Sequence, residues 1–128
     1  MIQEDNVIVF DIDGTLCGSL ETGQHYLDLA PDEKMIEKLK AYKNNGYYII
    51  LSTSRNMRTF KGNLGKINAV TGRDLFKWLE KNDIPFDEIY FGKPWCGHNG
   101  FYVDDKAIRP DEFLKYNHDE INDLLNVK

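Results

Sequence analysis

The sequence predicts an α/β fold in which helices flank a mainly parallel sheet. Short apolar runs alternate along the chain with segments that carry apolar residues at helical spacing. The first two runs, residues 7–10 and 47–51, are almost continuously apolar, which is typical of parallel strands covered on both faces. The predicted order of strand, helix, strand, helix, strand, strand fits parallel strands joined by helical crossovers.

Four apolar runs are expected to form the strands of this sheet. They are Val7–Phe10, Tyr47–Leu51, Glu88–Phe91 and Phe101–Val103. In open parallel sheets, ligands bind at the carboxyl ends of the strands. The polar residues that follow each run are therefore the candidates for a functional site.

Two amphipathic segments are expected to form the helices. The first runs from about Pro31 to Asn44, with acidic residues in its first turn and Gly46 beyond its end. The second is "TGRDLFKWLEKN", in which Thr71 is the expected N-cap and the apolar residues share one stripe.

Length and composition fit a single folded domain, residues 1–128, with one site. The 41% hydrophobic and 29% charged residues exclude a disordered chain, and the net charge of −5 gives no general attraction to nucleic acid. The first residues lack the apolar core of a signal peptide, and no apolar run reaches the length of a membrane span. We therefore expect a cytoplasmic protein without a membrane partner.

Polar residues with related chemistry follow all four predicted strands. In chain order they are Asp11 and Asp13, then Ser52, Thr53 and Arg55, then Lys93, and finally Asp104 and Asp105. Carboxylates gathered at one edge repel one another and favour a divalent cation, and oxygen ligands without histidine suit Mg²⁺. A lysine and a hydroxyl group beside them suit phosphate oxygens. The sequence therefore predicts a phosphoryl-transfer site that holds Mg²⁺ and takes a small phosphorylated substrate.

The segments "DIDGT", "LSTSR", "FGKP" and "YVDD" resemble, in order and in strand context, the four motifs of the haloacid dehalogenase superfamily phosphatases. The resemblance implies a Rossmann-like domain of that type. It implies that Asp11 is the nucleophile and becomes an aspartyl phosphate, and that Asp13 moves protons. It further implies that Thr53 and Lys93 hold the phosphoryl group, with Ser52 as the alternative hydroxyl.

The same resemblance implies a set of magnesium ligands. These are the carboxylate of Asp11, the backbone carbonyl of Asp13 and Asp104, with Asp105 as an outer or alternative ligand.

The spacing of the motifs leaves no room for a cap domain. The intervals from Asp13 to Thr53 and from Thr53 to Lys93 are 40 residues each, and the first is largely used by one helix. The remaining stretch, residues 16–30, is long enough for a small flap. A site without a cap needs a large substrate, a mobile loop or a neighbouring subunit to exclude water, so a homo-oligomer is one hypothesis.

Two longer segments, "TSRNMRTFKGNLGKIN" and "FGKPWCGHNGFYVDDKAIRP", resemble the small phosphatases associated with bacterial capsular polysaccharide biosynthesis. This resemblance implies a sugar-like phosphate as substrate. The alternative is a phosphatase for nucleotides or nucleic-acid ends, which the acidic net charge disfavours. A signalling receiver domain is disfavoured because its phosphorylated aspartate would follow the third strand, where this chain has Gly92 and Lys93.

Residues 55–73 form a basic segment in an otherwise acidic chain. Its cations are Arg55, Arg58, Lys61, Lys66 and Arg73. Two interpretations remain open: a substrate loop in which Arg55 or Arg58 binds an anionic group, or a solvated basic loop. Trp95, directly after "FGKP", is the better of the two tryptophans for covering a sugar face.

The cysteines and two histidines form a poor zinc motif. They are Cys17, His25, Cys96 and His98, separated by long gaps without a paired CxxC. Free thiols and a substrate contact by His98 are the favoured interpretations.

Overall fold

The computed structural model describes residues 5–18, 20 and 22–126 of the chain. It divides into two compact units, Met1–Trp95 and Cys96–Lys128, which are treated separately below. The expectation of one domain over residues 1–128 stays a prediction.

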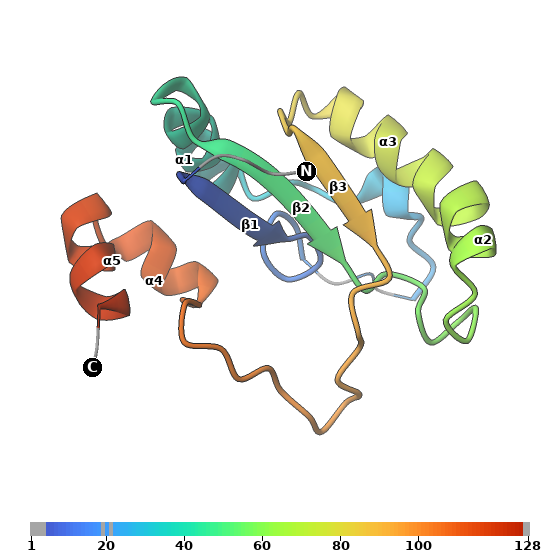
Figure 1. Ribbon diagram of the computed structural model, residues 1–128. Helices are drawn as coiled ribbons and strands as arrows, with labels where there is room; N and C mark the ends of the chain where they lie inside the picture. The colour runs from blue at the N-terminus through green and yellow to red at the C-terminus, as the bar shows by residue number, and fades with distance from the viewer. Residues whose placement is uncertain (1–4, 19, 21, 127–128) are drawn as a thin grey trace. The chain divides into compact units, whose positions relative to one another are not determined.

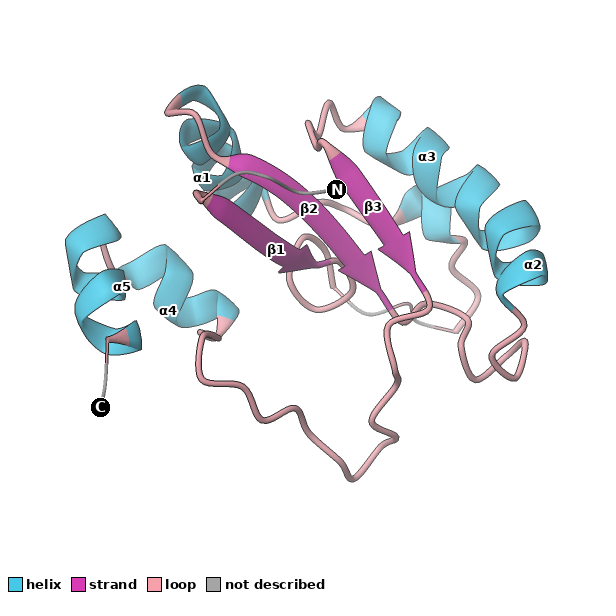
Figure 2. Cartoon of the chain, in the orientation of Figure 1, coloured by secondary structure: helices cyan, strands magenta, loops and turns pink. Residues whose placement is uncertain are grey.

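The first unit is built on a parallel sheet of three strands, β1 (Val7–Asp11), β2 (Tyr48–Thr53) and β3 (Glu88–Phe91), with β2 in the centre. All three arrows point the same way in Figure 2. Asp11 pairs in register with Ser52, and Thr53 pairs with Phe91, so the three strands end at one edge. The α/β fold with a mainly parallel sheet is confirmed, and the sheet brings the polar residues after its strands together.

Helices connect these strands. The 3₁₀ turn η1 (Tyr26–Asp28) and helix α1 (Glu33–Asn44) lie between β1 and β2 in the chain, and α2 (Leu64–Lys66), the π-helical segment η2 (Ile67–Thr71) and α3 (Gly72–Lys81) lie between β2 and β3. In Figure 1, α2 and α3 form one helical run beside β3. Helix α1 begins at its N-cap Asp32, whose side chain accepts a hydrogen bond from the Met35 backbone N–H.

The predicted N-cap at Thr71 is wrong. Thr71 has helical backbone angles, and its hydroxyl donates a 2.7 Å hydrogen bond to Oδ1 of Asn56 instead of capping a helix. The helical run begins earlier, where the side chain of Asn63 accepts from the Lys66 backbone N–H. The physical reason is that Asn63 satisfies an unpaired N–H at the start of the run, while Thr71 lies where the backbone is already helical.

The core of the first unit lies between the sheet and its helices. Its most buried apolar side chains are Ile12, Leu16, Met35, Leu39, Ile49, Leu51, Ile67, Leu75 and Trp78. The indole N–H of Trp78 donates a 2.8 Å hydrogen bond to the carbonyl of Leu29, which satisfies the polar atom of this buried ring. Burying each large side chain contributes about 1.5–3 kcal/mol. This core therefore supports the edge of the sheet that carries the polar residues.

The predicted flap, residues 16–30, is not exposed over its whole length. Leu16 and Leu29 are buried, and the backbone N–H of Asp32 donates to the carbonyl of Leu16 at 2.8 Å, so both ends of the segment are fixed in the core. Residues 22–25 between them are exposed, while residues 19 and 21 lie outside the described residues.

The second unit contains α4 (Pro110–Lys115) and α5 (His118–Leu125). Helix α5 begins with a capping box, in which Asn117 and Glu120 each accept from the other's backbone N–H. The predicted fourth strand, Phe101–Val103, is wrong: the described residues of this segment pair with no strand, and Phe101 and Val103 are 80% and 88% exposed. Three apolar residues are too few to make a strand without a partner to bond their backbone.

Within the described ranges, no helix is long and apolar enough to cross a membrane.

Candidate active site

Asp11 is the last residue of β1 and is partly buried at the carboxyl edge of the sheet. Its Oδ1 lies 3.4 Å from Nζ of Lys93, and its Oδ2 accepts a hydrogen bond of 3.3 Å from the Thr15 hydroxyl. Burial raises the pKa of the Asp11 carboxyl, and the charge of Lys93 works in the opposite direction. Both side-chain contacts are long, and a backbone hydrogen bond from Ile12 also holds the carboxylate.

Lys93 reaches Asp11 because of the backbone that carries it. Its N–H donates a 3.1 Å hydrogen bond to the carbonyl of Thr53, which ties the end of β3 to the end of β2. Gly92 before it has φ +85°, and a Cβ there would lie 2.5 Å from Cδ2 of Leu64. A left-handed backbone of this kind favours glycine, so Gly92 sets the direction in which the chain carries Lys93 to the site.

Asp13 follows the strand and is held by a bidentate ion pair with Arg55. Nε and Nη2 of Arg55 lie 3.0 Å and 2.8 Å from the two carboxylate oxygens of Asp13. The Arg55 side chain is 1% exposed and that of Asp13 is 30% exposed. The ring of Tyr26 covers the guanidinium at 4.0 Å, a cation–π contact. The structure therefore places Arg55 against Asp13, and the phosphate-binding role of Arg55 stays a prediction.

Thr53 and Ser52, the two candidate hydroxyl residues, lie at the end of β2. Thr53 is 1% exposed, and its Oγ1 accepts a 3.0 Å hydrogen bond from the Arg55 N–H, which leaves its own proton for another acceptor. Ser52 is half-buried and lies in register beside Asp11. Successive side chains of a strand point to opposite faces, so only one of the two can serve the site, and both alternatives stay open.

Asp104 and Asp105 belong to the second unit. Both are exposed, and Oδ1 of Asp104 accepts a 2.9 Å hydrogen bond from the Lys106 N–H in a tight turn. Within the part of the chain that the structure describes, no three His, Cys, Asp or Glu side chains gather as a metal-binding group. The metal-ligand roles of Asp11, Asp13, Asp104 and Asp105 stay predictions.

Cys17 adds a contact that the sequence did not predict. It is a free, buried thiol whose Sγ lies 3.7 Å from Oδ1 of Asp13. Burial, followed by the charge of Asp13, raises the pKa of the Cys17 thiol to about 12. Cys17 is therefore a protonated neighbour of Asp13 at neutral pH. Cys96 is also a free cysteine, in the second unit with His98.

A pocket of about 290 Å³, called the Asp13 pocket below, opens beside the ion pair. Its lining residues are Asp13, Tyr26, Ser54, Arg55, Asn56, Arg58, Thr59 and Trp95. They come from η1 and from the loops after β1, β2 and β3, which meet at the carboxyl edge of the sheet. No sequence motif marks Tyr26. Its contact with Arg55 is seen only in the structure.

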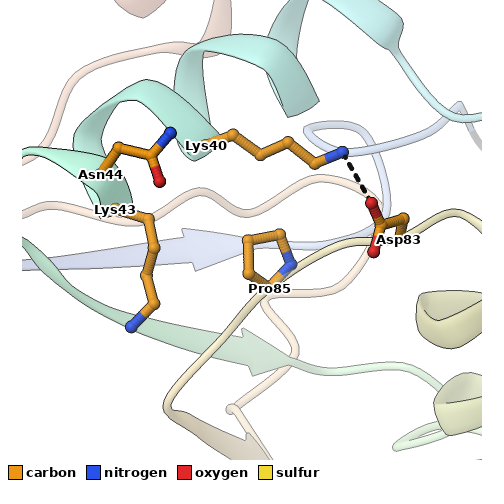
Figure 3. Close-up of a pocket in the computed structure, with 5 residues that line it drawn as sticks. All are labelled: Lys40, Lys43, Asn44, Asp83 and Pro85. Atoms are coloured by element: carbon orange, nitrogen blue, oxygen red, sulfur yellow. Dashed lines mark hydrogen bonds and ion pairs between the residues drawn. The ribbon is translucent and has the colours of Figure 1, made fainter.

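A second pocket, of about 240 Å³, lies at the opposite edge of the sheet (Figure 3). It is lined by Lys40, Lys43, Asn44, Asp83 and Pro85. Lys40 pairs with Asp83 at 3.4 Å, and Lys43 pairs with Asp87 at 2.7 Å just before β3 begins. Its lysines bind carboxylates of the same chain, and the pocket lies at the amino ends of the strands, away from the candidate site.

Comparisons with known proteins identify the family of this chain. The haloacid dehalogenase-like hydrolase family matches residues 8–107. The chain belongs to this family. The match covers β2, β3 and all of β1 except Val7, and it includes the segments that carry Asp11, Thr53, Lys93 and Asp104.

Two solved structures resemble this haloacid dehalogenase-like hydrolase. A crystal structure of a structural-genomics target from Vibrio cholerae is 46% identical, with a TM-score of 0.89 over 94% of this chain and 96% of that one. A chain of the Pnkp1/Rnl/Hen1 complex is 23% identical, with a TM-score of 0.49 over 86% of this chain and 33% of that one. No curated protein matches the chain.

Proposed function

We propose that this hydrolase is a Mg²⁺-dependent phosphomonoesterase that acts through an aspartyl phosphate on Asp11. The observation that carries the proposal is the contact between Oδ1 of Asp11 and Nζ of Lys93 at 3.4 Å, on the edge where β1 and β3 end. A carboxylate nucleophile beside a fixed ammonium group is suited to attack on a phosphoryl group, because the cation offsets the charge of both reactants.

The residues around Asp11 suit a magnesium ion. Burial raises the pKa of this carboxyl, and its side-chain contacts, 3.3 Å to Thr15 and 3.4 Å to Lys93, are long. Carboxylate and carbonyl oxygens are the ligands that Mg²⁺ prefers. Asp11, the backbone carbonyl of Asp13, and Asp104 or Asp105 would hold the ion. When bound, it would neutralise charge on the phosphoryl oxygens.

The proposed reaction has two steps, both carried by Asp11 and Asp13. In the first, an oxygen of Asp11 bonds to phosphorus, the bond from phosphorus to the leaving oxygen breaks, and that oxygen takes a proton from Asp13. In the second, Asp13 takes a proton from water, the water oxygen bonds to phosphorus, and the bond to Asp11 breaks to release phosphate. Lys93 holds the phosphoryl oxygens in both steps, with Thr53 or Ser52 as hydroxyl donor.

The proposed substrate is a small sugar-like phosphate used in the synthesis of capsular polysaccharide precursors. The resemblance of residues 53–68 and 91–110 to capsule-associated phosphatases supports this substrate class. The Asp13 pocket supports it as well, since its volume of about 290 Å³ is at the small end of ligand pockets.

The test is release of inorganic phosphate from p-nitrophenyl phosphate, with Mg²⁺ and with excess EDTA. We expect activity that depends on Mg²⁺ and that Asp11→Asn reduces at least about a thousandfold, because an amide cannot act as the nucleophile. Asp83→Asn is the matched control: its side chain is 97% exposed at the opposite edge of the sheet, and asparagine tolerates its φ of 53°. Full activity of Asp11→Asn, or activity that EDTA leaves intact, would contradict the proposal.

A further inference from the structure

One side chain of the Asp13 pocket is oriented by a residue outside the pocket. Asn56, which lines the pocket, accepts a 2.7 Å hydrogen bond on Oδ1 from the hydroxyl of Thr71. Thr71 is 3% exposed and is the last residue of the π-helical segment η2, a kind of turn often found at functional sites. The oxygen and the nitrogen of the amide belong to one rigid group, so the bond to Oδ1 also sets the direction of Nδ2.

The backbone holds Asn56 in place as well. Its φ is +62°, in the left-handed region where asparagine is enriched, and its carbonyl accepts a 2.9 Å hydrogen bond from the Phe60 N–H. The side-chain oxygen and the main chain of this residue are therefore both bound within the protein. A donor that is fixed in advance loses little conformational entropy when a ligand binds to it.

The amide nitrogen of Asn56 is open to a ligand. Within the described residues Nδ2 makes no hydrogen bond, so both of its N–H donors are available. Asn56 is half-buried, and Nδ2 is not among the buried side-chain atoms of those residues that lack a partner, so solvent reaches this nitrogen. A ligand oxygen in the pocket can therefore replace water at Nδ2.

The neighbouring wall of the pocket is also uncharged and polar. Ser54 and Thr59, from the same loop, line the pocket, and neither hydroxyl makes a hydrogen bond within the described residues. The rings of Tyr26 and Trp95 add apolar surface to this lining. Hydroxyl and amide groups beside aromatic rings suit a ligand with many hydroxyl groups and with C–H faces, such as a sugar or another polyol.

The pocket lies on the leaving-group side of the proposed reaction. Asp13, which would give its proton to the leaving oxygen, is a lining residue, whereas Asp11 and Lys93, which would contact the phosphoryl group, are not. A hydroxyl group that is recognised in this pocket therefore belongs to the group from which phosphate is removed.

We propose that Asn56 determines specificity by donating a hydrogen bond from Nδ2 to a hydroxyl oxygen of a neutral, polyhydroxy leaving group, and that Thr71 is the positioning residue for its amide. This inference rests on the proposed phosphatase function and adds the residue that selects the substrate. The pocket volume of about 290 Å³ is at the small end for ligand pockets, which favours a leaving group of one ring.

The experiment compares phosphate monoesters in two pairs. Myo-inositol 1-phosphate is paired with cyclohexyl phosphate, and glucose 6-phosphate is paired with cyclohexylmethyl phosphate. The members of a pair have rings of the same size and carry phosphate on the same kind of carbon, but only the first member has hydroxyl groups. We expect its kcat/KM to be at least about tenfold higher in one pair or in both, because the hydroxyl groups add hydrogen bonds. p-Nitrophenyl phosphate is the generic substrate.

Asn56→Gly is expected to lower this ratio of kcat/KM roughly five- to tenfold, because it removes the donor and leaves the left-handed backbone unstrained. Lys61→Gly is the matched control. Lys61 is an exposed residue of the same loop with φ +51°, and it does not line the pocket. This control keeps the full ratio, since a change of charge or of loop rigidity acts on both members of a pair alike.

Thr71→Val and Thr71→Ser test the positioning role. Valine keeps the shape of the side chain and removes the hydroxyl, so the amide of Asn56 can rotate, and we expect the ratio to fall about threefold. Serine restores the hydroxyl and is expected to keep the ratio within about twofold of the wild-type value. Because Thr71 is buried outside the pocket, recovery with serine separates positioning of the amide from packing of the core.

Equal kcat/KM within both pairs would overturn the inference while leaving the phosphatase intact. So would a ratio that Asn56→Gly leaves unchanged, or one that Lys61→Gly lowers to the same extent. An unchanged ratio in Thr71→Val would overturn the positioning role of Thr71. Phosphate release from none of the compounds, p-nitrophenyl phosphate included, would instead refute the proposed function itself.

Discussion

Arg55→Met tests how much the ion pair between Arg55 and Asp13 stabilises the folded chain. Arg55 is 1% exposed and donates two hydrogen bonds of 2.8 Å and 3.0 Å to Asp13, so the substitution leaves a partly buried carboxylate without its partner. Removing one member of a fully buried pair costs about 3–5 kcal/mol. Asp13 keeps 30% of its surface exposed and can be rehydrated, which lowers the cost. The substitution also removes Nη1, which has no hydrogen-bond partner among the described residues, and this lowers the cost further.

We therefore expect Arg55→Met to lower the free energy of unfolding by about 2 kcal/mol, measured by urea denaturation at pH 7. In an Asp13→Asn background the same change is expected to cost about 1 kcal/mol less, because the neutral amide no longer needs the cation. Arg58→Met, at an exposed position of the same loop, is the control and is expected to shift stability by less than about 0.5 kcal/mol. The reasoning is refuted if Arg55→Met changes stability as little as Arg58→Met, or if its cost is the same with and without the Asp13 carboxylate.

Two further predictions concern Asp87 and the hydroxyls of β2. Asp87 accepts hydrogen bonds from the Ile49 N–H at 2.8 Å and from Lys43 at 2.7 Å, which lower its pKa. A lowered pKa in the folded state gives stability that is present above the ordinary value of 3.8 and is lost as the pH falls through the folded value. Asp87→Asn should thus cost about 1 kcal/mol at pH 7 and progressively less below pH 3.8 in urea titrations; a cost independent of pH would contradict this. Thr53→Ala and Ser52→Ala distinguish the two hydroxyls: the residue that donates to phosphate should lose about a hundredfold in kcat/KM for p-nitrophenyl phosphate, and the other less than about threefold. Equal losses would show that neither acts alone.

The sequence was sufficient to predict the parallel sheet and the meeting of Asp11 with Lys93. Both follow from the rule that parallel strands deliver the residues after them to one edge, and that rule needs only the apolar runs and their order. The prediction of a fourth strand was wrong because three apolar residues give the same pattern in a strand and in an exposed segment. Only pairing with a neighbouring strand distinguishes the two. The N-cap prediction at Thr71 was wrong because more than one residue near this helical run can cap a helix. The chain uses the earlier one, Asn63.

The pairing of Arg55 with Asp13 could not be predicted from the sequence for a different reason. An arginine two residues beyond the end of β2 can reach a phosphate, the solvent or the neighbouring strand end, and its long side chain gives no periodic signal. In the structure the guanidinium pairs with Asp13, and the ring of Tyr26 covers it at 4.0 Å. Tyr26 lies in the predicted flap, residues 16–30, where no motif distinguishes it from its neighbours.

The contact between Tyr26, Arg55 and Asp13 bears on how a hydrolase without room for a cap protects its chemistry. The Tyr26 ring covers Arg55, and Arg55 holds both oxygens of Asp13, so a residue of η1 is coupled to the proposed proton-transfer residue through a buried cation. Each Asp13 oxygen accepts one hydrogen bond from Arg55, which leaves a second lone pair on each for the proton that the proposed reaction moves. Arg55 also lines the Asp13 pocket, so a ligand bound there lies beside the guanidinium that holds Asp13. In this arrangement the ring of Tyr26 covers one face of that guanidinium and also lines the Asp13 pocket, so it excludes water from one side of the ion pair.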